Sequence, residues 1–211
     1  MINAKLDGYS SGATRLLYFT TLSNLWIGIT DLILIVAISL KKEKSLNKLY
    51  FLRYIFTVSI TVTGVFFCSI LGPNADESYH PWSLASIMTH ALSPAFAIID
   101  FFVDRRKIRL SIKGVALSLL PSVLYTSVAS ALGTLGVDFG RGEAFPYFFM
   151  NYHSPAGLFG FSNEMPYLLG SFYWIVFLVA FMIGLASFYA LFSGAKEKPR
   201  QEDNGAESSI I

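Results

Sequence analysis

Charged residues are scarce in this sequence, and their scarcity excludes most water-soluble folds. Only 14% of the 211 residues are Asp, Glu, Lys or Arg, whereas soluble domains carry roughly 25%. The net charge of +2 is too small to indicate a nucleic-acid partner. A single cysteine, Cys68, excludes an internal disulfide, and the sequence has no pattern for a tetrahedral metal site or a nucleotide-binding loop. We therefore expect a membrane protein without a cofactor, a metal ion or a nucleic-acid partner.

Long apolar runs take the place of the missing charges. Five runs approach or exceed the roughly 20 helical residues needed to cross a bilayer core about 30 Å thick. Because the backbone in lipid has to form its own hydrogen bonds, each run is predicted to be a helix. The runs cover residues 18–40, 54–71, 82–103, 114–135 and 166–192. The sequence predicts an all-α bundle of about five transmembrane helices, forming one domain over residues 1–192, with a disordered cytoplasmic tail at 193–211. Pro121 should bend the fourth helix.

The positive charges are unevenly distributed and predict an orientation. Thirteen of the 16 Lys and Arg residues fall within segments 41–53, 104–113 and 196–200. Alternation of five helices places these three segments on the same side, which the positive-inside rule makes cytoplasmic. We therefore expect a multi-pass protein of the cell membrane with its N-terminus outside and its C-terminus in the cytoplasm.

The connection between the fourth and fifth runs, residues 136–165, is long and rich in aromatic residues. A solvated loop would not be so apolar, so we expect a re-entrant or interfacial lid over the outer helix ends. The rings of residues 145–149 and 159–161 should then be at least partly buried.

Polar residues follow one face of the first helix. Thr20, Asn24, Gly28 and Asp31 are spaced by three or four residues, which places them on one side. An ionised carboxylate in the bilayer centre costs about 2.5–3.5 kcal/mol on insertion scales. Asp31 is therefore either protonated or paired with a hydroxyl of a neighbouring helix, or it has a direct functional role.

The third helix carries a second polar stripe. Ser83, Ser86, His90, Ser93 and Asp100 recur along it, and such a stripe should face another helix or a wet cavity. We expect it to face the helix of Thr20 and Asp31. His90, the only histidine in a predicted span, either ties two helices together by a hydrogen bond or acts as a general base or proton carrier.

Two short motifs lie on these stripes. Residues 18–25 read Tyr-Phe-Thr-Thr-Leu-Ser-Asn-Leu, and residues 90–94 read His-Ala-Leu-Ser-Pro, followed by Asp100; residues 145–149 read Phe-Pro-Tyr-Phe-Phe. These motifs resemble those of the androgen-induced and androgen-dependent membrane protein superfamily, and its bacterial branch in particular. The best-known members hydrolyse fatty-acid esters of hydroxy fatty acids. They usually have six helices, with one before the threonine motif.

The resemblance implies a catalytic pair. In those hydrolases a threonine of the first motif is the nucleophile and a histidine of the second is its partner, which correspond here to Thr20 and His90. Thr21 adjoins Thr20, so the choice between the two threonines stays open. A helix starting near residue 12, capped by Ser10 or Ser11, would bring Thr20 level with His90.

The remaining polar residues would support that pair. Asn24 would orient Thr20, and Ser93, Asp31 and Asp100 complete the expected site. The function implied is intramembrane hydrolysis of a lipid ester near the outer leaflet, with membrane lipids as partners and an acyl lipid as substrate.

Two other functions stay open at this point. Asp31, His90 and Asp100 would serve as a relay in a non-enzymatic carrier or proton-coupled transporter, although five helices without an internal repeat do not match common transporter folds. The third alternative is a structural membrane protein.

Overall fold

The computed structural model describes residues 12–74, 80–104, 111–140 and 142–193. The regular secondary structure of this part of the chain is helical and includes no β-strand, only an isolated bridge between Phe161 and Leu169. In chain order the helices are α1 (Gly12–Arg15), α2 (Phe19–Ser39), α3 (Glu43–Phe66), η1 (Phe67–Leu71), α4 (Leu84–Ile87), η2 (Met88–Leu92), α5 (Ser93–Asp104), α6 (Ile112–Ser118), α7 (Leu120–Thr134), η4 (Phe148–Met150) and α8 (Ser171–Phe192).

Five stretches of the described chain are long and apolar enough to cross a membrane. They are Phe19–Ser39, Lys44–Leu71, Leu84–Asp104, Ile112–Thr134 and Ser171–Phe192. The predicted all-α bundle with five spanning helices is confirmed. Residues 1–11, which include the predicted N-caps Ser10 and Ser11, lie outside the described residues. So do residues 194–211, which were predicted to belong to the tail.

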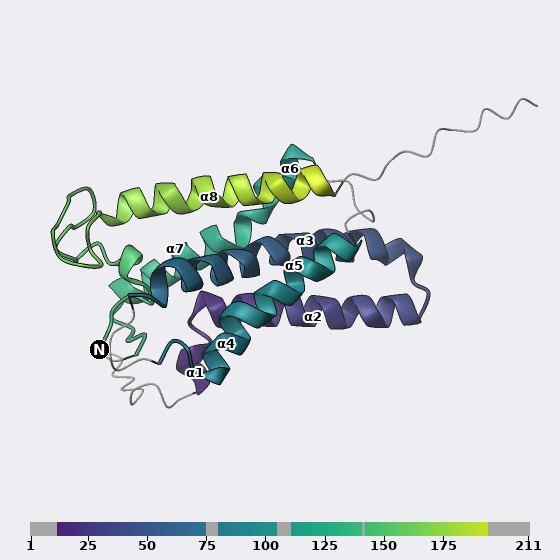
Figure 1. Cartoon of the computed structure of the whole chain (residues 1–211), viewed down its shortest axis with the longest axis horizontal. Coiled ribbons are helices and arrows are strands. Elements are labelled where there is room, and N and C mark those ends of the chain that lie inside the picture. Colours follow the sequence, from purple (N-terminus) through teal and green to yellow (C-terminus); the bar gives the residue numbers. More distant parts are fainter. Residues whose placement is uncertain (1–11, 75–79, 105–110, 141, 194–211) are drawn as a thin grey trace, which may run out of the picture.

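Helix α3 is the centre of the bundle. It packs against α2, α5, α6, α7 and α8 (Figure 1), and Tyr54, Val58 and Ile60 on it are fully buried. The helix begins at Glu43, eleven residues before the apolar run that starts at residue 54, so Arg53 lies within it rather than in a loop. A π-helical segment, η1, continues α3 to Leu71.

The start of α2 is set by contacts from distant parts of the chain. After the single turn α1, the helix is interrupted before Phe19. The Tyr125 hydroxyl donates to the carbonyl of Leu17 (3.0 Å), and the Tyr18 hydroxyl donates to the carbonyl of Phe139 (2.7 Å). The expectation of one continuous helix from about residue 12 is therefore wrong, and Thr20 lies in the first turn of α2.

The fourth span is broken where Pro121 predicts a bend. Helix α6 ends at Ser118 and α7 starts at Leu120, because proline has no N–H to continue the helical hydrogen bonds. The break changes the course of the chain: α6 packs against α8, whereas α7 runs away from α8 toward the other end of the bundle (Figure 1).

The long connection between α7 and α8 closes that end. Phe145 and Met150 are buried with Phe139 against Ala129 of α7, so the predicted burial of segment 145–149 is confirmed. The second aromatic segment is covered less than the first: Phe159 and Phe161 are 59% and 71% exposed. Their rings pack on Phe172 and Tyr173 in the first turn of α8, so only this contact with a helix end agrees with the prediction.

Candidate functional site

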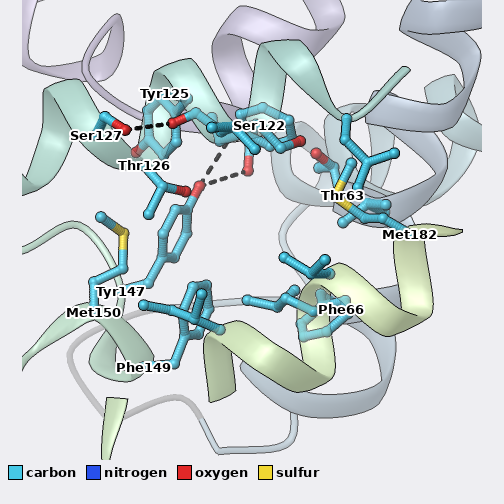
Figure 2. A pocket seen from close by; sticks show the side chains of 18 of the residues that line it. Thr63, Phe66, Ser122, Tyr125, Thr126, Ser127, Tyr147, Phe149, Met150 and Met182 are labelled. Carbon is cyan, nitrogen blue, oxygen red and sulfur yellow. Dashed lines mark hydrogen bonds between the residues drawn. The ribbon is translucent and has the colours of Figure 1, made fainter. Parts of the chain in front are cut away.

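A cavity of about 260 Å³ lies between α3, α7 and α8 (Figure 2). The first turn of α2 and the segment around η4 also contribute residues to its lining. Its walls are mainly aromatic and aliphatic, with Phe66 from α3, Leu178 and Met182 from α8, and Phe149 and Met150 from the α7–α8 connection. Apolar walls around a few polar groups are typical of small-molecule sites.

The polar groups in this cavity are all hydroxyls. They belong to Thr20, Thr63, Ser122, Tyr125, Thr126, Ser127 and Tyr147, and none of the described residues lining the cavity is charged. Figure 2 shows several of these side chains on one side of the cavity, above the rings of Phe66 and Phe149. The cavity is thus amphipathic but uncharged.

Thr20 reaches the cavity beside Tyr147. The Thr20 N–H donates to the Tyr147 hydroxyl over 3.4 Å, and the two side-chain oxygens are 3.5 Å apart. Helix N-termini leave backbone N–H groups without helical partners, so a phenol oxygen here satisfies one of them. Burial raises the pKa of Tyr147, which keeps the phenol protonated and able to donate a hydrogen bond.

Sequence reasoning noted Tyr147 in the 145–149 motif but gave it no role at Thr20. The available signal was a hydroxyl-bearing residue in an otherwise apolar motif. Its partner was not visible, because the two residues are 127 positions apart.

Ser122 adds a hydroxyl that makes no hydrogen bond to the described part of the chain. Its Oγ is buried at the wall of the cavity, and the described part of the chain offers it no hydrogen-bond partner. A buried hydroxyl without a partner is costly, by about 1–3 kcal/mol. The Ser122 hydroxyl is therefore a ready donor or acceptor for a molecule in the cavity.

His90 belongs to different surroundings. Its Nδ1 lies 2.9 Å from both the Ser86 carbonyl oxygen and the Thr89 Oγ1. Its ring stacks on Phe67 at a centroid distance of 3.8 Å. It is not among the residues lining the cavity, and no hydrogen bond between described residues joins it to Thr20.

Asn24 links the two motifs through the backbone. Its side-chain amide donates to the carbonyl of Thr20 (2.8 Å) and to the carbonyl of Thr89 (3.0 Å). Asn24 therefore fixes the first turn of α2 against η2, and it orients the backbone of Thr20.

The four supporting residues line a second cavity. Asn24, Asp31, Ser93 and Asp100 surround a space of about 420 Å³ between α2, η2 and α5. The two polar stripes thus face each other at these positions, as expected. His90 departs from that expectation because its ring contacts Phe67 of η1.

Next to this second cavity, one arginine forms ion pairs with three carboxylates. Arg53, whose side chain is only 5% exposed, places Nε 3.1 Å from Asp31 Oδ1 and Nη1 3.2 Å from Asp104 Oδ2, and Nη2 contacts Asp100. A guanidinium has five donors in a fixed plane, which suits several carboxylates at once.

These contacts add to two sequence interpretations. Segment 41–53 was expected to be a loop, but Arg53 lies in α3 with its side chain buried. Asp31 is paired with this arginine, a partner that the sequence did not predict, and the pairing leaves a functional role for Asp31 a prediction. Within the described ranges, no group of three or more His, Cys, Asp or Glu is arranged to hold a metal ion.

Comparison of the chain with protein-family models, with curated proteins and with solved structures gives no match. The resemblance to the androgen-induced and androgen-dependent superfamily therefore rests on the short motifs, and the geometry of the two cavities is the basis for assigning a role.

Proposed function

We propose that this integral membrane protein binds a lipid molecule in the cavity between α3, α7 and α8. The observation that carries the proposal is the composition of that cavity, whose walls are apolar and whose only polar groups are hydroxyls. A hydrocarbon chain is stabilised against such walls by about 25 cal/mol per Å² of apolar surface removed from water. The oxygen-bearing end of the lipid accepts or donates hydrogen bonds at Thr20, Ser122 and Tyr147.

A bulky substitution tests this proposal directly. Val179 of α8 lines the cavity, whereas Val176, one turn earlier on the same helix, is 51% exposed and does not. Val179→Trp should fill the cavity and prevent labelling by a photoreactive lipid in membranes, while Val176→Trp should leave labelling intact. Both variants are checked for a monodisperse peak after purification. Equal labelling of the two folded variants would contradict the assignment of the cavity.

A second function, hydrolysis of a lipid ester, is favoured by the position of the Thr20 hydroxyl in that cavity. Thr20 Oγ1 attacks the ester carbonyl carbon, the bond to the alcohol oxygen breaks, and the proton of Thr20 passes through the Tyr147 phenol to the departing alcohol. Water then attacks the acyl-threonine, which releases the carboxylic acid and restores the threonine hydroxyl. His90, proposed as the base from the family resemblance, is not among the residues that line this cavity.

The hydrolytic proposal is tested with a lipophilic fluorophosphonate, which labels activated hydroxyl nucleophiles. The labelled peptide should contain Thr20, and Thr20→Ala should remove both the label and the cleavage of a lipid ester. Thr21→Ala provides the matched control, because Thr21 does not line the cavity. Labelling that survives Thr20→Ala would exclude this residue as the nucleophile.

A further inference from the structure

The cavity has an open side that faces away from the bundle. The break before Pro121 sends α7 away from α8 (Figure 1), and both helices contribute residues to the lining of the cavity. Val123 of α7 and Ile175 of α8 both line the cavity and are 50% and 37% exposed. They form the rim of an opening between the two helices.

This rim lies on the part of the bundle with the least protein around it. The spans Ile112–Thr134 and Ser171–Phe192 have the smallest buried shares of the five. Exposed side chains on spanning helices face lipid, and the two that form the rim, Val123 and Ile175, are apolar. A molecule dissolved in the bilayer therefore reaches the cavity sideways, without passing through water.

The charge of the cavity limits what can enter. A phosphate or carboxylate drawn into an apolar site without a counter-ion loses its hydration and gains no ionic partner. The described lining has no Lys, Arg or His to supply one. A hydroxyl or an ester is desolvated at lower cost and finds hydroxyl partners, including the unmet Ser122 Oγ.

The size of the cavity points to a small ligand. Sites for drug-sized molecules measure about 300–1,000 Å³, and the cavity of about 260 Å³ lies just below that range. One hydrocarbon chain suits this space better than two.

We propose that the ligand is an uncharged single-chain lipid carrying a hydroxyl or an ester, and that it enters from the membrane between α7 and α8. This inference rests on the proposed lipid-binding function and adds the chemical class of the ligand and its route. The Ser122 hydroxyl hydrogen-bonds the polar end of the ligand, and the chain lies against Phe66, Leu178 and Met182.

The class of ligand is tested with three diazirine-bearing lipids added to the full-length protein in lipid nanodiscs: a monoacylglycerol, a fatty acid held ionised at alkaline pH, and a phosphatidylcholine. The monoacylglycerol should label peptides of α7 or α8 that line the cavity, and the other two should not. Ser122→Ala should lower the apparent affinity for the monoacylglycerol by about fivefold, the value of one hydrogen bond. Equal labelling by all three lipids would overturn the neutral-lipid assignment and leave lipid binding intact.

The route by which the lipid enters is tested by narrowing the opening between α7 and α8. Val123→Trp should slow labelling by the monoacylglycerol, whereas Leu124→Trp, on the neighbouring exposed position outside the cavity lining, should not. Equal rates for these two variants, with both purified as folded protein, would exclude the opening between α7 and α8. Absence of cavity labelling by every lipid would instead refute the lipid-binding function itself, so the failures are distinguishable.

Discussion

Arg53 lies with its Nε 3.1 Å from Oδ1 of Asp31, which joins the central helix α3 to the middle of α2. The same guanidinium contacts Asp100 and Asp104 of α5. Three helices are thus held by one buried cation. Removing one partner from a buried ion pair leaves an uncompensated charge, which is more costly than the pair itself.

Arg53→Gln should therefore destabilise the protein, but by less than the roughly 3–5 kcal/mol of a fully buried pair, because Asp31 and Asp100 are 36% and 49% exposed. The loss is measured as a lower midpoint of thermal unfolding in detergent, followed by the fraction that stays monodisperse. Lys48→Gln is the matched control, because Lys48 is an exposed cation one turn away from the cluster on the same helix. A similar small effect in both variants would show that the cluster does not hold the helices together.

Substitution of one carboxylate in this cluster should lower the stability of the protein less than substitution of Arg53. Asp100→Asn removes one of three negative partners, and Asp31 and Asp104 still neutralise Arg53. The substitution also relieves repulsion between carboxylates that share one guanidinium. We expect a smaller fall in the unfolding midpoint than for Arg53→Gln. If Asp100→Asn lowered the unfolding midpoint as much as Arg53→Gln does, the two remaining carboxylates would not be enough to neutralise Arg53.

Helices α3 and α5 approach closely at a glycine. A Cβ atom at Gly64 would lie 2.7 Å from Cβ of Pro94, closer than real side chains approach. Gly64→Ala should therefore separate the helices and destabilise the fold by about 1–3 kcal/mol, the usual cost of overpacking. Gly28→Ala, where nothing lies within 4 Å of the added atom, should be neutral in the same unfolding measurement.

The sequence was informative where the signal is local. Apolar run length predicts the five spans, and Pro121 predicts the break between α6 and α7, because both depend on neighbouring residues. The interruption before α2 could not be predicted, since it depends on hydroxyls of Tyr18 and Tyr125 bonded to backbone over 100 positions away.

In the candidate site, too, local sequence patterns predicted some contacts, and contacts between distant residues were missed. The polar stripes predicted that Asp31, Ser93 and Asp100 would meet, and the second cavity brings them together. Arg53 was missed because a cation at the start of an apolar run looks like the end of a loop. Its burial depends on carboxylates from two other helices, and no local pattern encodes that.

The orientation in the membrane stays a prediction from the positive charges. In a Cys68→Ser background, a single cysteine at Asn74 or Asn163 should react with an impermeant thiol reagent added outside cells. One at Ser45 or Ser111 should react only after the membrane is permeabilised. All four positions are exposed, so reactivity reports the side of the membrane rather than burial. The opposite pattern would place the cavity of Thr20 near the cytoplasmic leaflet.

The group that transfers the Thr20 proton is open to a direct test, because the two candidates, a phenol relay and a histidine base, respond differently to pH. Tyr147 lies 3.5 Å from the Thr20 hydroxyl, and burial raises its pKa, so this phenol stays protonated around neutral pH. If Tyr147 relays the proton, ester cleavage should stay level between about pH 6 and 8. A histidine base acts only when neutral, so cleavage through His90 should fall once the medium is acidified enough to protonate the imidazole.

Two substitutions make the same distinction without reference to pH. Tyr147→Phe keeps the ring packed against Phe149 and removes only the hydroxyl. Under the Tyr147 mechanism, this variant should lose about 10²–10⁴-fold in the rate of ester cleavage, the contribution usual for a positioned proton-transfer group. His90→Ala should then retain most of the activity, with a loss of stability from the missing stack on Phe67. A severe loss of activity in His90→Ala, with Tyr147→Phe active and both proteins folded, would support the threonine–histidine pair instead.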